Sequence, residues 1–380
     1  MKIAFVTNLC PHYRIKTFEL MARRFDIDFY FFSAGDDWYY QQEHDVHAGQ
    51  FRFRGLSGFH LGRTRITPGL LLALLHGDYD VYIKCINGRF VLPVTYLAAR
   101  VRRKPFILWT GIWVRLGTIA HRAFFSMTRF IYTHSDAVVT YGEHVKQYLS
   151  SEGVEPSRVF VASHAVDNDL YSRDIPEAEK KSLRRELSLD PGSTVILFMG
   201  RLEEEKGLPY LVDAFAELDK QDAVLVLAGT GSRMRELQAR ADRQGILDRV
   251  RFPGYVSPES TPVYFNVASA LALPSISLPI GKEPWGLVVN EAMNQGTPVI
   301  VTDAVGAAAG GLVRNGVNGF VVPERDTGTL VTALRRIACE HDLREKLGAN
   351  ARKTVADWTN ERMVDGFERA IEYACSNRQQ

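Results

Sequence analysis

Two short clusters in the second half of the sequence combine residue types that bind phosphate and sugar groups. The first reads GRLEEEKG at residues 200–207, where a buried apolar run ends and a helical pattern begins. Gly200 lets the backbone approach a ligand there, and Arg201 and Lys206 can close on one anion from two sides. We interpret the cluster as a phosphate clamp. The alternative is that both cations are surface charges that balance the three intervening glutamates.

The second cluster reads KEPWGLVVNEA at residues 282–292. Pro284 and Gly286 indicate a loop, after which residues 287–294 are predicted to be helical. Free N–H groups at a helix start favour an anion such as a diphosphate. Glu291 can accept two hydroxyl hydrogen bonds from a ribose, and Glu283 can accept them from another sugar. The alternative is that neither glutamate binds a ligand. Glu283 would then be a charged residue of a surface loop, and Glu291 would interact only with the helix dipole.

These clusters lie in an alternation of β-branched or aromatic runs with amphipathic helical stretches, which is typical of parallel sheets covered by helices. A first series of strands is predicted at 2–6, 27–32, 81–85, 106–109, 137–140 and 159–161. A second series is predicted at 195–199, 223–228, 250–252, 270–274, 298–302 and 320–322. The charged stretch 174–193 and its Pro191-Gly192 turn predict a boundary between domains 1–173 and 174–380. Because α/β sheets bind ligands at the carboxyl ends of their strands, we expect the active site in the cleft between the domains.

Several stretches of the second half resemble the family 4 retaining glycosyltransferases: residues 200–207, AGTGSRMREL at 228–237, RFPGYV at 251–256 and LPSISLPIGKEPWGLVVNEAMNQGTPVI at 273–300. Glu283 and Glu291 match that family's pattern of two glutamates separated by seven residues. The resemblance implies the α/β GT-B fold, with two Rossmann-like doubly wound domains facing across a cleft. It also implies that the last helix, about 360–376, crosses back to the first domain.

The same resemblance implies that domain 174–380 holds a nucleoside diphosphate sugar. Arg201 and Lys206 would then hold the diphosphate, Glu291 the ribose and Glu283 the hydroxyls of the transferred sugar, so Glu283, Arg201 and Lys206 are the expected catalytic residues. We expect a UDP- or GDP-sugar whose base lies near backbone groups of Tyr255 and Val256. The predicted donor-binding residues are Gly200, Arg201, Lys206, Gly229, Gly231, Tyr255, Val256, Glu283, Trp285, Gly286, Leu287, Val288 and Glu291.

The first half resembles the family more loosely. Residues 8–14 read NLCPHYR where many members have a glycine pair, and residues 109–111 read WTG where many have a histidine. Residues 164–165 read His-Ala in place of Asn-Gly. We place the acceptor side at His12, Tyr13, Arg14, Thr110 and Gly111.

The composition is that of an ordinary globular protein, with 46% hydrophobic and 24% charged residues, which excludes collagen-like and disordered classes. Four cysteines without a CxxC pair indicate a reducing, cytoplasmic setting, and the apolar run 3–6 is too short for a signal peptide. No metal or other cofactor is expected, since no histidine has metal-ligand spacing and two of the three Asp-x-Asp sequences lie where predicted strands begin.

Positive charge is concentrated in the first half. Residues 1–173 contain 21 Lys and Arg against 15 Asp and Glu, and the stretch 81–135 contains nine basic residues and no acidic one. Basic residues mixed with aromatic ones can lie on anionic lipid headgroups, so we predict a peripheral protein at the cytoplasmic face of the membrane. The alternatives are a groove for an anionic soluble acceptor or a simply solvated surface. Nucleic acid is not an expected partner.

We therefore expect a retaining, metal-independent hexosyltransferase. It would move a sugar from the nucleotide sugar to a hydroxyl of a glycan or lipid-linked acceptor in cell-surface polysaccharide synthesis. Two alternatives are a catalytically silent protein that binds sugar nucleotides or glycans, and a nucleotide-sugar hydrolase or epimerase on the same fold.

Overall fold

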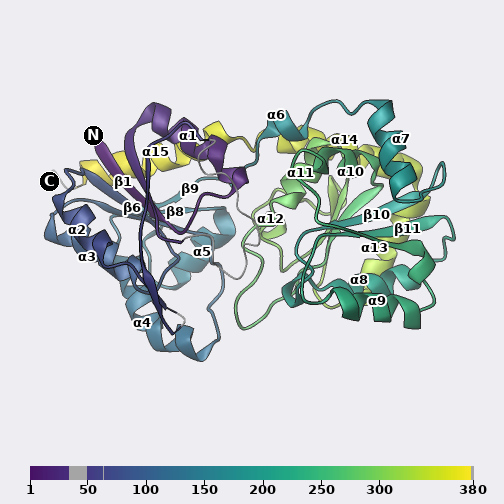
Figure 1. Cartoon of the computed structure of the whole chain (residues 1–380), viewed down its shortest axis with the longest axis horizontal. Helices are drawn as coiled ribbons and strands as arrows, with labels where there is room; N and C mark the ends of the chain where they lie inside the picture. The colour runs from purple at the N-terminus through teal and green to yellow at the C-terminus, as the bar shows by residue number, and fades with distance from the viewer. Residues whose placement is uncertain (34–48, 63, 378–380) are drawn as a thin grey trace. The chain divides into compact units, whose positions relative to one another are not determined.

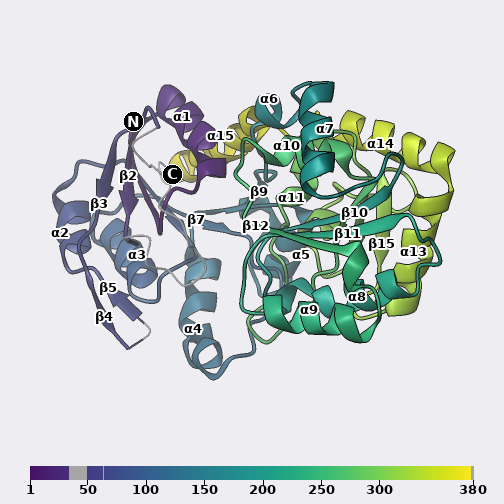
Figure 2. The same cartoon turned by 45° about the vertical axis from the view of Figure 1, so that its right-hand side comes forward.

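The computed structural model describes residues 1–33, 49–62 and 64–377, and the chain forms two compact α/β units (Figure 1, Figure 2). Unit 1 comprises Met1–Trp113, Gly117–His164 and the segment from Asn360 onwards; unit 2 comprises Val114–Leu116 and Ala165–Thr359. The change from one unit to the other at residues 164–165 lies before the boundary predicted at 173–174. The reason is that α6 (Asn168–Tyr171) packs against α11 (Val288–Asn294) of unit 2.

Unit 1 contains a parallel seven-stranded sheet in the order β3-β2-β1-β6-β7-β8-β9. Its strands are β1 (Lys2–Thr7), β2 (Asp26–Phe31), β3 (Phe53–Gly55), β6 (Val81–Cys85), β7 (Phe106–Thr110), β8 (Ala137–Thr140) and β9 (Val159–Val161). Its helices are α1 (Ile15–Arg24), α2 (Gly69–His76), α3 (Val91–Val101), α4 (Ile119–His134), α5 (Glu143–Ser151) and α15 (Asn360–Ser376). The six predicted strands are confirmed. The short β3 and the hairpin of β4 (Phe59–Leu61) and β5 (Thr64–Ile66) were not predicted, because three residues show no usable periodicity.

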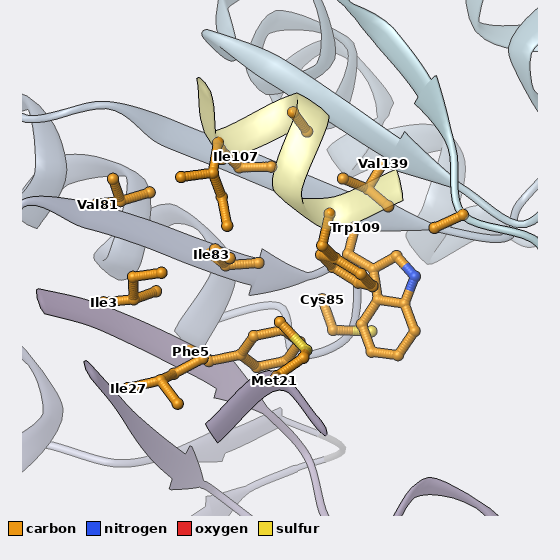
Figure 3. Packing of buried hydrophobic residues seen from close by; sticks show 14 of the residues in the cluster. Ile3, Phe5, Met21, Ile27, Val81, Ile83, Cys85, Ile107, Trp109 and Val139 are labelled. Atoms are coloured by element: carbon orange, nitrogen blue, oxygen red, sulfur yellow. The ribbon is translucent and has the colours of Figure 1, made fainter. Parts of the chain in front are cut away.

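The strands of unit 1 are apolar on both faces because helices cover both faces of the sheet. On one face, α1 and α15 pack over Phe5, Ile83, Trp109 and Val139, and Figure 3 shows these side chains converging. On the other face, side chains from α2, α3 and α5 surround Tyr82, Leu108 and Val138, among other buried residues. Because neighbouring strands pair in register, residues that are opposite each other in the sheet point their side chains to the same face.

Helix α15 is an integral part of the unit 1 core. Met363, Phe367 and Ile371 recur at helical spacing and are almost fully buried against the sheet. Gly366, one position before Phe367, faces β9: a Cβ atom there would lie 2.6 Å from the carbonyl oxygen of Val161. The helix therefore needs glycine at this position to approach the strand edge.

Unit 2 contains a parallel six-stranded sheet in the order β12-β11-β10-β13-β14-β15. Its strands are β10 (Thr194–Met199), β11 (Ala223–Ala228), β12 (Val250–Gly254), β13 (Ala270–Leu273), β14 (Val299–Thr302) and β15 (Gly319–Val322). Besides α6 and α11, its helices are α7 (Glu177–Glu186), α8 (Leu208–Ala216), α9 (Met234–Arg243), α10 (Thr261–Val267), α12 (Gly306–Ala309), α13 (Thr327–Cys339) and α14 (His341–Val355). All six predicted strands are present within two residues at each end.

We predict that Gly366→Ala lowers the free energy of unfolding by about 1–3 kcal/mol, because the added methyl group overpacks the contact between α15 and β9. Gly328→Ala is the matched control in helix α13, since the nearest atom to a Cβ there is 3.6 Å away. Alanine should be neutral or stabilising at that position because it is the better helix former. Urea denaturation measures the free energy of unfolding of both variants. Equal stability of the two variants would contradict the close approach of α15 to β9.

Candidate functional site

The site in unit 2 begins with two glycine loops that touch through their backbones. Gly200 follows β10 with φ +148° and Gly229 follows β11 with φ +136°. A Cβ atom on Gly229 would overlap the carbonyl oxygen of Gly200, and one on Gly231 would overlap that of Leu202. The Leu202 amide donates to the Thr230 carbonyl at 2.8 Å, which fixes the two loops to each other. The turn around Gly229 and Gly231 is thus a support for the loop that carries Arg201 and Lys206.

Lys206 lies at the end of the 3-10 helix η4 (Glu204–Lys206) and forms an ion pair with Glu283. Both side chains are only 13% exposed, and the Ser275 hydroxyl donates to the same Glu283 oxygen at 3.2 Å. Burial opposes ionisation of Glu283. The Lys206 charge, with hydrogen bonds from Lys206 and Ser275 and the charge of Arg201, nevertheless holds the pKa of that carboxyl below its ordinary value. The site therefore contains an ionised carboxylate that a cation holds in place.

Arg201 donates to the Glu205 carboxylate at 2.6 Å and is 38% exposed. The sequence suggested that Arg201 and Lys206 either clamp an anion or balance the glutamates between them. In the structure each cation has a carboxylate partner, and Arg201 also acts electrostatically on Glu283. The two cations and Glu283 therefore form one charged group, which the spacing of residues 200–207 alone does not reveal.

The Pro-Trp-Gly loop is held by backbone hydrogen bonds to residues 305–307. The Gly306 amide donates to the Glu283 carbonyl at 3.1 Å, and the Ala307 amide donates to the Trp285 carbonyl at 2.8 Å. Trp285 was predicted to bind the donor, but its ring is 2% exposed and its Nε1 donates to Asn290 Oδ1 at 2.8 Å. Its side chain thus supports the loop from the core, and Gly286, at φ +86°, turns the chain into α11.

Glu291 lies in the first turn of α11, which begins at Val288, one residue later than predicted, with Leu287 as its N-cap. Burial raises the pKa of the Glu291 carboxyl to about 7, and a hydrogen bond from Tyr171 opposes this rise. Tyr171 is a contact that sequence reasoning missed, because it lies more than a hundred residues away in α6 and was assigned to the first domain. No spacing pattern joins the two residues.

Tyr255 and Val256 follow β12 and line a shallow cavity of about 320 Å³ between α7 and α10. Tyr255 is 48% exposed, so its ring is open to a ligand or to solvent. The lining of this cavity includes neither Arg201 nor Lys206 nor either of the two glutamates of the site.

The residues predicted for the acceptor side all belong to unit 1 and follow or end its strands at their carboxyl ends. His12, Tyr13 and Arg14 form the 3-10 helix η1 after β1, and Thr110 ends β7 directly before Gly111. A side chain at Gly111 would overlap the ring of Tyr141. The structure therefore brings two distant sequence segments to the same sheet edge.

Two family models match most of the chain. The model described as "Glycosyl transferases group 1" matches residues 179–354, and "Glycosyltransferase Family 4" matches residues 17–170. The D-inositol 3-phosphate glycosyltransferase of Xylanimonas cellulosilytica is 33% identical over 227 residues, which are 57% of this chain and 52% of that protein. The alpha-D-kanosaminyltransferase of Streptomyces kanamyceticus is 32% identical over 186 residues, 48% of this chain and 46% of that protein. The chain thus spans about half the length of the curated relatives it matches.

Solved structures resemble the whole chain. Anabaena Alr3699/HepE in complex with UDP superimposes with a TM-score of 0.81 at 19% identity, covering 98% of this chain and 100% of that one. WaaG, a glycosyltransferase involved in lipopolysaccharide biosynthesis, superimposes with a TM-score of 0.69 at 18% identity, covering 96% and 98%. At such identities the likeness establishes the fold, which is GT-B with two Rossmann-like units.

We predict that Glu291 makes stability depend on pH. Because the folded-state pKa is raised to about 7, its contribution to stability is full below pH 4.5 and is lost as pH rises through 7. The unfolding free energy of the wild type, relative to Glu291→Gln, should fall by about 2–3 kcal/mol between pH 5 and pH 8. Tyr171→Phe should move this loss to higher pH, because it removes the hydrogen bond that lowers the pKa. A pH-independent difference between wild type and Glu291→Gln would show that Glu291 titrates normally.

Proposed function

The chain belongs to the family 4 glycosyltransferases, and we propose that it is a retaining, metal-independent enzyme that uses a nucleoside diphosphate sugar. The proposed acceptor is a hydroxyl of a glycan or lipid-linked precursor in cell-surface polysaccharide synthesis. One observation carries the donor assignment: the buried ion pair between Lys206 and Glu283, beside the glycine loops at the carboxyl edge of the unit 2 sheet. The structures of HepE with UDP and with UDP-glucose support a nucleotide sugar as the donor.

In this proposal each charged residue has a separate task. Arg201 and Lys206 bind the diphosphate, which gains negative charge as it leaves, so both cations contribute most in the transition state. Glu291 accepts hydrogen bonds from the ribose, and the base lies near Tyr255 and Val256. Glu283 orients the transferred sugar through its hydroxyls.

Retention is proposed to proceed without a covalent sugar on the enzyme. Glu283 is bound by Lys206 and Ser275, which weakens it as a nucleophile, and Glu291 is assigned to the ribose. The donor phosphate itself is then the base for the acceptor hydroxyl. The fixed cations supply the charge stabilisation that a divalent metal would otherwise give the leaving group.

A panel of UDP-, GDP- and ADP-sugars, tested for thermal stabilisation, identifies the donor, because binding to the folded state raises the unfolding temperature. The anomeric configuration of the product, with and without a chelator, then tests the mechanism. Donor binding without turnover on any acceptor would favour a silent binding protein. Sugar release or isomerisation without acceptor would favour a hydrolase or epimerase.

We predict that Lys206→Ala and Arg201→Ala each lower kcat by about 10²-fold or more, because each removes a cation aimed at the leaving group. The loss in kcat should exceed the loss in nucleotide affinity. Arg233→Ala is the matched control, since Arg233 is 38% exposed and pairs with Glu204 and Glu236 in the same loop region. Wild-type turnover in both test variants would show that Arg201 and Lys206 do not form the donor site.

We also propose that helix α4 attaches the protein to an anionic membrane surface. Its exposed side chains include Ile119 at 81%, Phe124 at 46% and Phe130 at 49%, beside Arg122 and Arg129. No helix in the described part of the chain is long and apolar enough to cross a bilayer. Exposed aromatic residues with cations on one helix are typical of interfacial attachment.

Several cations of the stretch 81–135 have partners within the protein, so fewer of them are available to bind an anionic membrane surface. Within the basic stretch, Arg100, Arg102 and Lys104 pair with acidic residues just outside it, Arg129 of α4 pairs with Glu152 at 3.7 Å, and Lys84 is fully buried. Roughly 1 kcal/mol per cation near an anionic surface would be available from the remaining ones. The attachment is therefore assigned to α4 rather than to the whole stretch.

We predict that the wild type sediments with vesicles containing anionic lipid at low salt and dissociates at high salt. The double variant Arg122→Glu, Phe130→Ser should lose most of this binding, because it removes one cation and one exposed ring from α4. Arg102→Glu, Lys104→Glu is the control, since both side chains already have acidic partners. A wild type that ignores anionic vesicles at low salt would leave a soluble acceptor as the better proposal.

A further inference from the structure

In the part of unit 1 that the structure describes, a buried arginine has no carboxylate partner. Arg14 is 4% exposed, and among the described residues no acidic side chain forms an ion pair with it. Placing a charge in a protein interior is costly unless another charge compensates it. By contrast, Arg24, ten residues later, is partly exposed and pairs with both Asp365 and Glu368.

The surroundings of Arg14 stabilise a cation but leave its charge uncompensated. Its guanidinium donates to the His164 ring at 2.8 Å and to the Met363 sulfur at 3.3 Å, and lies 4.6 Å from the Trp109 ring centre. Burial, and then the charge of Arg14, hold the pKa of His164 well below its ordinary value. The other rings near the guanidinium belong to Tyr13 and Tyr141, which are partly exposed, so the site borders solvent.

Trp109 provides a second donor at the same place. Its Nε1 is buried and has no hydrogen-bond partner within the described residues. Figure 3 shows this nitrogen pointing away from the aliphatic core around Ile83 and Ile107. An indole N–H can only donate, so its partner must be an acceptor. Arg14 and Trp109 thus present donors and no negative charge.

Both residues lie at the edge of the sheet where parallel α/β sheets bind ligands. Trp109 is next to the last residue of β7, Arg14 follows β1, and His164 follows β9. A buried guanidinium without a compensating charge, beside an indole donor, suits the several oxygens of a phosphate group better than a single carboxylate.

We propose that Arg14 and Trp109 Nε1 bind a phosphate group carried by the acceptor. This inference rests on the proposed function, because it assigns the acceptor-side ligand of the same enzyme. The guanidinium would donate to two phosphate oxygens and the indole to a third or to the ester oxygen. The acceptor is then a phosphorylated sugar or a lipid-linked sugar phosphate rather than a neutral glycan.

Titration calorimetry with α-D-glucose 1-phosphate tests the site in the full chain that carries Arg201→Ala and Lys206→Ala, so that the donor cations do not contribute. In this background Arg14→Gln should weaken binding by about tenfold to a hundredfold, since it removes a charge-assisted contact. Arg14→Lys should lose less, and Trp109→Phe should lose several-fold while keeping an aromatic ring. Arg24→Gln, which removes a cation already paired with α15, should bind as its parent does.

Three further ligands test whether the site prefers phosphate to a carboxylate, and whether the phosphate belongs to a lipid or to a soluble molecule. Methyl glucoside should not bind, and glucuronate should bind more weakly than the phosphate; stronger binding of glucuronate would overturn the assignment to phosphate. Farnesyl diphosphate in phosphatidylcholine vesicles, tested as a competitor, distinguishes a lipid-linked source from a soluble one.

The proposal is overturned if glucose 1-phosphate does not bind the parent, or binds Trp109→Phe and Arg14→Lys as tightly as the parent. Thermal unfolding of each variant shows whether it is folded. If Arg14→Gln does not fold, Trp109→Phe still tests the phosphate site. Nucleotide-sugar binding to the wild type is measured in parallel. Donor binding with no phosphate binding rejects only this site, whereas phosphate binding through Arg14 with no donor binding rejects the proposed function.

Discussion

The contact between the backbones of Gly200 and Gly229 is the constraint on which the unit 2 site depends. No side chain fits between the two loops, so they can lie directly on each other at the ends of adjacent strands. That contact fixes the start of the loop that continues to Lys206. Lys206 in turn holds Glu283, whose backbone carbonyl is bound by Gly306 after β14. Loops that follow four strands, β10, β11, β13 and β14, are thereby joined into one group with few side-chain contacts.

The two units treat buried charge in different ways. In unit 2 the buried cation Lys206 has a carboxylate partner, so the site is close to neutral before any ligand arrives. In unit 1, Arg14 is surrounded by rings, and Lys84 is fully buried with its ammonium group donating to backbone carbonyls of Cys85 and Asn87. Burial lowers the pKa of Lys84 to about 7, whereas an arginine stays charged under all ordinary conditions. Arg14 therefore has the stronger need of an anion.

The sequence predicts the sheets well and the contacts within the sites poorly. Strands such as Val81–Cys85 are continuous apolar runs because both faces are covered, and such runs are visible without a structure. The motifs around Arg201 and Glu283 likewise identify the two loops that the structure joins through the Lys206–Glu283 ion pair. Their pairing, the burial of Trp285 and the contact of Tyr171 with Glu291 arise from packing between segments far apart in the chain. Local periodicity contains no information about such packing.

Helix α15 has a consequence for how the protein is made. Its side chains cover the sheet face formed by β1, β6, β7 and β8, yet the ribosome adds them only after all of unit 2. At about 5–20 residues per second, some 200 residues separate the end of β9 from Met363, a delay of roughly 10–40 s. During this interval the apolar face of the first sheet lacks the part of its cover that α15 provides, while unit 2 is being synthesised. The nascent chain therefore cannot complete the core of its first unit until the second unit has been made.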